Sequence, residues 1–226
     1  MKRPSPILRP TQARYIDSLR PLRDVLVAEM EKYALDNDVP IAMPELGRLL
    51  EALAASKPAG RCLEIGSAIG YGTLRLARGA REGRVVSIER DGARLAIARE
   101  YLATGGVLPR VDFLQGEALE VLRGVQGPFD LVYIDGDKRD YRRALDLTLP
   151  MVNVGGYVVV DNLLWHGSIA DPKLRAENDE SAREIERFNP YFMIHPQLAT
   201  VLLPLGDGVG LGVKRRQTIR ELGGPF

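Results

Sequence analysis

Between residues 61 and 162 the sequence alternates short apolar runs with segments of helical periodicity. The runs are RCLEIG (61–66), RVVSIE (84–89), VDFLQG (111–116), FDLVYID (129–135) and GGYVVVDN (155–162). Runs that are apolar on both faces suit parallel strands that are covered by helices on each side. The segments between them, at about 72–80, 91–104, 117–123 and 139–149, have the periodicity of those helices. The alternation therefore predicts an α/β fold with a Rossmann-like, doubly wound sheet.

A helical pattern without strands precedes this core. Residues 11–36 carry apolar positions at helical spacing, and Pro21 divides them into two helices because an interior proline breaks the hydrogen-bond ladder. A third helix fits residues 44–55, with Pro44 in its first turn. We therefore expect an N-terminal helical cap over residues 1–55.

A hairpin signal closes the pattern. After a helix near 180–189, the apolar runs 199–206 and 209–215 flank the dipeptide Asp207-Gly208. The expected sheet is therefore seven-stranded and mostly parallel, with a C-terminal antiparallel hairpin. A chain of 226 residues suits one domain, with a core over 56–215 and a polar tail over 216–226.

Composition excludes several classes of protein. Lys and Arg number 31 against 30 for Asp and Glu, and the resulting net charge of +1 argues against a nucleic-acid partner. A single cysteine and two histidines argue against a disulfide framework and against a cysteine- or histidine-based zinc site. No apolar run approaches the ~18 residues of a membrane span, and the first ten residues lack the apolar region of a secretory signal. We therefore expect a cytoplasmic protein with no membrane partner.

A glycine-rich loop follows the first predicted strand. Its glycines, Gly66, Gly70 and Gly72, do not have the spacing of a dinucleotide fingerprint, and the lysine of a P-loop is missing. Glu64 stands beside the loop, where a carboxylate repels a pyrophosphate and attracts a cation such as the sulfonium of S-adenosylmethionine. Glu89 ends the second predicted strand, where an acid can accept both ribose hydroxyls. The alternative is a glycine-rich structural turn with two surface acids. The glycines, Glu64 and Glu89 all fall at the same edge of the predicted sheet, and this grouping favours a cofactor site.

Polar side chains follow the fourth and fifth predicted strands. They are Asp135, Asp137 and Lys138 after the fourth strand and Asp161 and Asn162 after the fifth. Two carboxylates and an amide oxygen at adjacent strand ends suit Mg²⁺ or Mn²⁺, although such residues also cap turns. Lys138 is either a surface ion-pair partner or a general base beside the metal.

Together these motifs resemble the cation-dependent class I O-methyltransferases, the caffeoyl-coenzyme A and catechol O-methyltransferase group that includes bacterial members. The resemblance runs from about Pro40 to Val213. The matching stretches are CLEIGSAIGYGTLRLA (62–77), VVSIER (85–90), GEALEVL (116–122), FDLVYIDGDKRDY (129–141), GGYVVVDNLLWHG (155–167) and LLPLGDGVGL (202–211). The most specific part is the stretch DNLLWHG after a strand that ends in DGDK.

The resemblance implies roles for individual residues. It implies metal ligation by Asp135, Asp161 and Asn162, with Mg²⁺ (or Mn²⁺ or Ca²⁺) as the ion, and catalysis by Lys138. The cofactor contacts that it implies are Ala42, Glu64, Gly66, Ser67, Gly72, Glu89, Ala118, Asp135 and Asp137. Two of these depart from the family pattern, because many members have Ser at the position of Gly72 and Ala42 offers only a backbone contact. Trp165 and His166 fall where the family contacts its acceptor, although from the residues alone Trp165 could equally cap the core and His166 could be incidental.

The resemblance also implies the reaction. We expect methyl transfer from S-adenosylmethionine to a small phenolic acceptor with vicinal hydroxyls, in a metal-dependent enzyme that forms a homodimer. A methyltransferase acting on RNA or another non-catechol acceptor is disfavoured because the strand-four motif reads Asp-Gly-Asp-Lys. A nicotinamide-dependent dehydrogenase is disfavoured by the glycine spacing. A non-enzymatic protein that only binds S-adenosylmethionine stays open.

Overall fold

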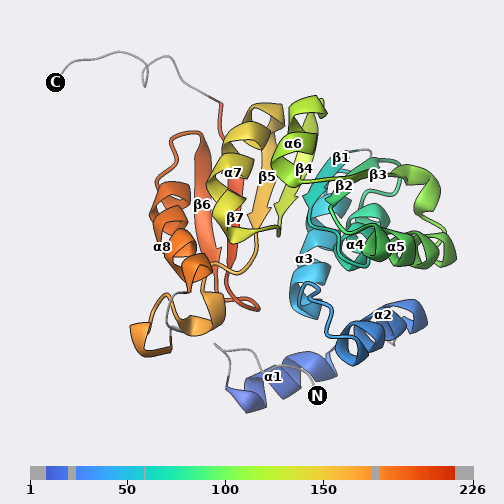
Figure 1. The fold of residues 1–226 in the computed structure, drawn as a ribbon, viewed down its shortest axis with the longest axis horizontal. Helices are drawn as coiled ribbons and strands as arrows, with labels where there is room; N and C mark the ends of the chain where they lie inside the picture. Colours follow the sequence, from blue (N-terminus) through green and yellow to red (C-terminus); the bar gives the residue numbers. More distant parts are fainter. Residues whose placement is uncertain (1–8, 20–23, 59, 175–178, 217–226) are drawn as a thin grey trace.

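A mixed sheet forms the centre of the computed structural model, which describes residues 9–19, 24–58, 60–174 and 179–216 (Figure 1). Its strands are β1 (Arg61–Ile65), β2 (Arg84–Glu89), β3 (Val111–Gln115), β4 (Phe129–Ile134), β5 (Val152–Val160), β6 (Leu198–Leu203) and β7 (Val209–Lys214). They lie in the order β3-β2-β1-β4-β5-β7-β6. β1 to β5 are parallel, and β7 runs antiparallel to both β5 and β6. The predicted fold class is confirmed.

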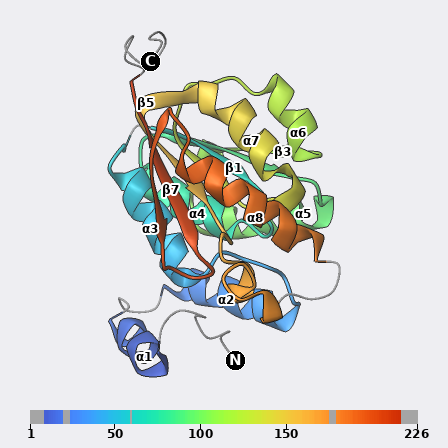
Figure 2. The same ribbon diagram turned by 90° about the vertical axis from the view of Figure 1, so that its left-hand side faces the viewer.

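Helices cover both faces of the sheet, as the apolar strands require. The helices are α1 (Pro10–Ser18), α2 (Val25–Asp36), α3 (Pro44–Ala55), α4 (Tyr71–Gly79), α5 (Gly92–Thr104), α6 (Ala118–Val121), α7 (Tyr141–Thr148) and α8 (Glu180–Met193). One core cluster joins α2, α3, α4 and α5 to the sheet, and a second joins α7 and α8 to the opposite face. Figure 2 shows the same layers from the side. No helix of the described residues has the length and apolar character needed to cross a membrane.

Helix starts follow from the local sequence. Asp24, Asp91 and Asp179 are the N-caps of α2, α5 and α8, and each side chain accepts a backbone N–H of the first turn. α3 begins at Pro44 as predicted, where the missing N–H costs nothing. α1 and α2 are separate helices, while Pro21, residues 1–8 and the tail over 217–226 lie outside the described residues.

Three boundaries differ from the sequence prediction. α8 continues through Pro190 to Met193, because Phe188 and Phe192 on either side are both buried in the core. β5 begins at Val152, before the glycine pair. β6 ends at Leu203, so residues 204–208 form the connection and not Asp207-Gly208 alone. Pro204 explains the early end, since a proline cannot donate to the ladder.

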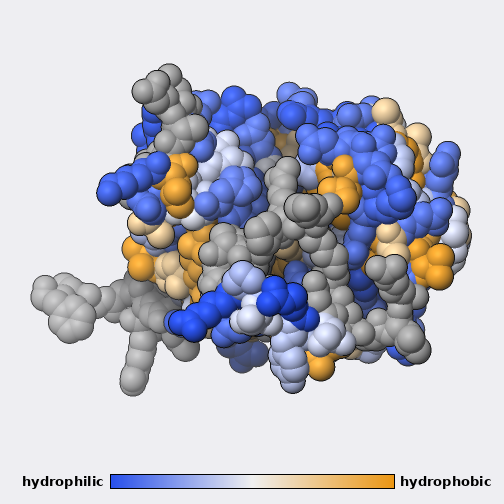
Figure 3. Space-filling model, turned by 90° about the horizontal axis from the view of Figure 1, so that it is seen from below, coloured by the Kyte–Doolittle hydropathy of each residue, from blue (hydrophilic) through white to orange (hydrophobic). Residues whose placement is uncertain are grey.

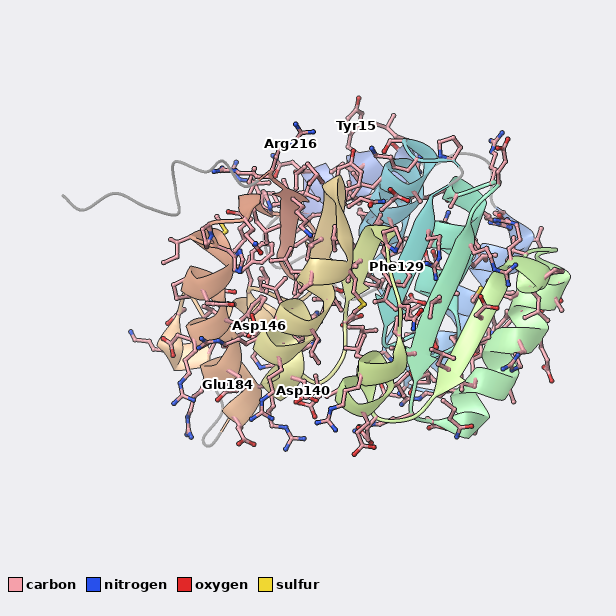
Figure 4. All side chains as sticks on the ribbon, turned by 90° about the horizontal axis from the view of Figure 1, so that it is seen from above. Tyr15, Phe129, Asp140, Asp146, Glu184 and Arg216 are labelled. Carbon is pink, nitrogen blue, oxygen red and sulfur yellow. The ribbon has the colours of Figure 1, made fainter. Side chains whose placement is uncertain are left out.

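The far side of the sheet is closed by contacts between α7 and α8. Tyr191 of α8 donates a hydrogen bond to Asp146 of α7, and the ring of Tyr141 meets that of Phe188 edge to face at 5.5 Å. Figure 4 looks at the molecule from above and labels Asp146 on α7 and Glu184 on α8. These contacts anchor the start of α7, which carries residues of the candidate site.

Candidate active site

A cleft of about 2660 Å³ opens at the carboxyl ends of the parallel strands. Residues of α1, α2 and α3 line it opposite the strand ends, and Figure 1 shows these helices at that end of the molecule. Figure 3 views this end from below, where hydrophilic and apolar residues are interspersed around the helices. The position agrees with the general rule that open α/β sheets bind ligands beyond the carboxyl ends of their strands.

Strand register brings three chain segments together at the cleft floor. Ile134 pairs with Ile65 on one side and with Val160 on the other, so the residues that follow lie side by side. The N–H of Asp135 donates to Ile65 O at 2.9 Å, and that of Asp161 donates to Ile134 O at 3.1 Å. Gly66 has a φ of 91°, and a Cβ there would lie 2.3 Å from Asp135 O. A glycine at this position is therefore what allows the strand ends to approach.

Lys138 lies at the centre of the polar strand ends. It follows β4 in a short 3₁₀ turn (Lys138–Asp140), and its side chain is largely buried. Its Nζ donates to Asp135 Oδ1 at 3.1 Å, to Asn162 Oδ1 at 2.7 Å and to Tyr141 Oη at 2.5 Å. The Trp165 ring centroid is 5.8 Å away. A cationic group can therefore contact oxygens from β4 and β5 simultaneously.

The oxygens around Lys138 fit a divalent cation. Burial raises the pKa of Asp161 above its usual range, and the neighbouring Asp135 carboxylate raises it further. A bound cation relieves that repulsion, and carboxylate and amide oxygens are the ligands that Mg²⁺ prefers. The described residues contain no group of three His, Cys, Asp or Glu side chains that could hold a metal. The predicted ligand set, the amide oxygen of Asn162 beside Asp135 and Asp161, stays a prediction.

Eleven of the predicted site residues line this single cleft. They are Ala42, Gly66, Glu89, Ala118, Asp135, Asp137, Lys138, Asp161, Asn162, Trp165 and His166. The remaining three, Glu64, Ser67 and Gly72, do not line it and are buried next to it.

Glu89 lines the cleft and orders the glycine-rich loop after β1. Its Oε2 accepts the N–H of Ala68 at 2.9 Å, and its Oε1 accepts the N–H of Asp91 at 3.0 Å. Ala68 has a φ of 45°, a conformation that is unusual for a residue with a Cβ. Each carboxylate oxygen keeps a further lone pair for a ligand.

Asp137 faces the same part of the cleft and is tied to Arg139. The guanidinium donates to Oδ1 at 3.0 Å and to Oδ2 at 2.6 Å, and this bidentate pair lowers the pKa of Asp137 to about 2. The carboxylate is therefore charged at neutral pH and can accept hydrogen bonds from a ligand.

Glu64 is buried beneath α4, with 1% of its surface exposed. Its Oε2 accepts hydrogen bonds from Ser87 Oγ at 2.6 Å and from the hydroxyl of Thr73, while Oε1 has no partner among the described residues. Burial raises the pKa of Glu64 to about 7 against the two hydrogen bonds, which lower it. A Cβ at Gly72 would lie 2.3 Å from Oε1, so the missing side chain leaves room for the carboxylate. Ser67 is likewise buried, and its Oγ lacks a partner among these residues.

Another side of the cleft is formed by the loop after β5. Trp165 packs against the core beside α8 and also lines the cleft, and its contact with an acceptor stays a prediction. Its indole N–H donates to Asp179 Oδ2 at 2.8 Å. His166 exposes 63% of its side chain at the cleft.

Two residues at the site were not predicted from the sequence. Tyr141 donates from its hydroxyl to Asp161 O at 3.0 Å while it contacts Lys138. Asp207, predicted only as part of a turn, accepts the N–H of His166 at 2.6 Å. Its partners lie more than 40 residues away in the chain, so no local pattern signals the contact. For Tyr141, the only signal was its position just after the lysine.

Comparison with known proteins agrees with this geometry. A family model described as O-methyltransferase matches residues 18–215. A catechol O-methyltransferase of Mycobacterium tuberculosis is 36% identical over 176 residues, which cover 75% of this chain and 78% of that protein.

Solved structures show the same fold. Cofactor-bound Rv0187 from MTB has a TM-score of 0.82 at 31% identity, over 96% of this chain and 100% of that one. An O-methyltransferase from Bacillus cereus in complex with SAH has a TM-score of 0.78 at 27% identity, over 89% of this chain and 96% of that one. The family model covers most of the chain, and the enzyme class predicted from the sequence is confirmed. The chain belongs to the O-methyltransferase family.

Proposed function

We propose that this O-methyltransferase transfers a methyl group from S-adenosylmethionine to one of two vicinal hydroxyls of a catechol-type phenol, with a divalent metal ion at Asp135, Asp161 and Asn162. The relative from Mycobacterium tuberculosis is named for catechol, and the Bacillus cereus relative was solved with SAH. The observation that carries the proposal is the position of Lys138 Nζ, which contacts oxygens of Asp135 and Asn162 within one cleft.

The protein's own residues divide into two groups in this proposal. Glu89, Asp137, Ala118 and the backbone at Ala42 and Gly66 bind the cofactor along the ends of β1, β2 and β4. The buried carboxylate of Glu64 and the partly exposed carboxylate of Asp135 make this side of the cleft favourable for a sulfonium.

The second group acts at the acceptor. A phenol has a pKa near ~10 and is mostly neutral at pH 7, and a divalent cation, when bound, supplies a Lewis acid that favours the phenolate. Lys138 is placed to take the proton from the acceptor oxygen or to stabilise the anion. Trp165 and His166 form the wall that orients the ring, and α1, α2 and α3 cover the cleft. Holding the two reactants in line contributes roughly 7–11 kcal/mol in favourable cases.

A methyl-transfer assay on paired phenols tests the proposal. A catechol should be converted to its mono-methyl ether with Mg²⁺ or Mn²⁺, while that ether and a simple phenol should react poorly because they lack the second hydroxyl. Turnover should vanish with chelator and in Asp161→Ala. Asp112→Ala, which removes a surface ion pair with Arg84, is the control and should keep full activity. Full activity in excess chelator, or equal rates on the catechol and its ether, would refute the metal-chelation proposal.

The homodimer and the cytoplasmic location remain predictions. Sedimentation of the purified chain tests the first, and subcellular fractionation tests the second.

A further inference from the structure

The connection between β6 and β7 is bonded to the loop that follows β5. The N–H of Leu163 donates to Gly208 O at 2.9 Å, and that of Leu164 donates to Asp207 O at 2.9 Å. The side chain of Asp207, with 8% of the residue exposed, reaches past these bonds and accepts the N–H of His166 at 2.6 Å. Three residues of the loop, Leu163, Leu164 and His166, are therefore bonded to two residues of the connection.

The loop over residues 162–167 has an unusual backbone. Asn162, Trp165 and His166 have φ values of 62°, 43° and 57°, in the left-handed region that residues with a Cβ rarely adopt. Such a conformation persists only where the surroundings determine it. The described contacts that hold the loop come from the connection and from α8, where Asn189 donates to Leu163 O at 2.8 Å and the N-cap Asp179 accepts the indole N–H of Trp165. On the side of the connection, Gly208 packs so closely that a Cβ there would lie 2.5 Å from Leu164.

The side chain of Asp207 also orients the amide of Asn162. Asn162 Oδ1 accepts from Lys138 Nζ at 2.7 Å, and its Nδ2 donates to Asp207 Oδ2 at 3.4 Å. A carboxylate can only accept, so it selects the rotamer in which NH₂ faces Asp207 and the oxygen faces Asp135 and Lys138. A flipped amide would present NH₂ groups to that position, and these do not ligate a hard cation.

We propose that Asp207 is a positioning residue, which holds Asn162, Trp165 and His166 in their left-handed conformation and keeps the Asn162 oxygen directed at the cation position. The second half of this inference rests on the proposed metal site, whereas the first half concerns the loop alone. Residues that hold metal ligands in place typically change metal affinity by 10- to 100-fold when they are replaced.

The test uses variants Asp207→Ala and Asp207→Asn with Asp130→Asn as the matched control. Asp130 likewise accepts one backbone N–H, that of Arg61 at 3.0 Å, and one amide, that of Asn153 at 2.8 Å. It lies on β4 near the opposite end of the sheet, so its loss should affect stability without touching the cleft. Asp207→Asn keeps an oxygen that can accept the N–H of His166, but it can turn its NH₂ group toward Asn162. This variant keeps the test decisive if Asp207→Ala does not fold.

Two readouts separate the loop from the metal. Trp165 is the single tryptophan of the chain, so acrylamide quenching of its fluorescence reports on the loop without any ligand. Quenching should rise about twofold or more in Asp207→Ala, as expected when a local segment opens. Calorimetric titration with Mn²⁺ alone should show dissociation constants raised roughly 10- to 100-fold in both Asp207 variants. Asp130→Asn should match the unchanged protein in both measurements.

Each result has a distinct meaning. Unchanged quenching in Asp207→Ala would overturn the role in loop order, and unchanged Mn²⁺ affinity in both variants would overturn the role at Asn162. Equal changes in Asp130→Asn would overturn both, because they would reduce the effect to general stability. If the unchanged protein binds no Mn²⁺, the proposed metal site fails and the role at Asn162 fails with it, while the quenching result still decides the role in the loop.

Discussion

Replacing Glu64 by glutamine should stabilise the protein above neutral pH and remove a pH dependence of its stability. Glu64 is fully buried, and burial raises its pKa from 4.5 to about 7. The folded protein therefore holds this proton more tightly than the unfolded chain does. The resulting stabilisation is complete below about pH 4.5 and is lost as the pH rises through 7. Glutamine has the same shape, accepts from Ser87 and Thr73 through its oxygen, and cannot ionise.

The magnitude follows from the pKa difference. At about 1.4 kcal/mol per pKa unit, ionising Glu64 in the folded protein costs about 3 kcal/mol of unfolding free energy by pH 8. For a domain of this size, each kcal/mol moves the midpoint of thermal unfolding by about 2–4 °C. Glu64→Gln should therefore melt about 6–12 °C higher than the unchanged protein at pH 8, and the two should nearly coincide at pH 4.5.

Thermal unfolding of both proteins from pH 4.5 to 9 measures the effect. Glu82→Gln, at an exposed position, controls for the loss of one acid at the surface and should follow the unchanged protein. Binding of S-adenosylmethionine should strengthen with pH through 7 in the unchanged protein, because the charged carboxylate favours a sulfonium, and should be weaker in Glu64→Gln. Parallel stability curves for the unchanged protein and Glu64→Gln would refute the reasoning.

Three further substitutions test the site. Glu89→Ala should raise the dissociation constant of S-adenosylmethionine by roughly 10- to 150-fold with the acceptor KM unchanged. A calorimetric change below about threefold would limit Glu89 to its hydrogen bonds with the loop. Lys138→Ala should lower kcat on catechols by about 10²- to 10⁴-fold with little change in cofactor affinity, and unaltered turnover would contradict a role at the acceptor oxygen. Tyr141→Phe should lower kcat, and loss of the hydroxyl hydrogen bond should lower the unfolding free energy by about 1 kcal/mol. The ring of the variant keeps its contact with Phe188. A loss of stability without a change in kcat would limit Tyr141 to a structural role.

Much of the fold could be predicted because its signals are local. Strands such as β2 and β4 are short runs that are apolar on both faces, and helix starts such as Pro44 depend on neighbouring residues. The extension of α8 could not be predicted, because burial of Phe192 in the core outweighs the usual effect of Pro190. The early end of β6, by contrast, has a local cause in Pro204, which the prediction over 199–206 passed over.

The candidate site could be predicted where it depends on topology. Parallel strands bring their carboxyl ends to one edge, so Asp135 and Asp161 could be placed together from the sequence. Side chains alternate along a strand, and Glu64 therefore shares the face of Cys62 beneath α4, where it is buried next to the cleft and does not line it. Asp207 could not be found, because its role depends on contacts with residues 162 and 166 that only the folded chain creates.

The residues that line the cleft come from two groups of chain segments, which meet where β1 pairs with β4. The glycine loop and Glu89 come from β1 and β2, whereas Asp161, Asn162, Trp165 and Asp207 come from segments after β4. A chain built in this way can change its acceptor by altering the later segments, without disturbing the ones that would hold the methyl donor. For directed evolution toward new phenols, libraries belong in residues 163–174 and 204–206, with Asn162 and Asp207 left unchanged.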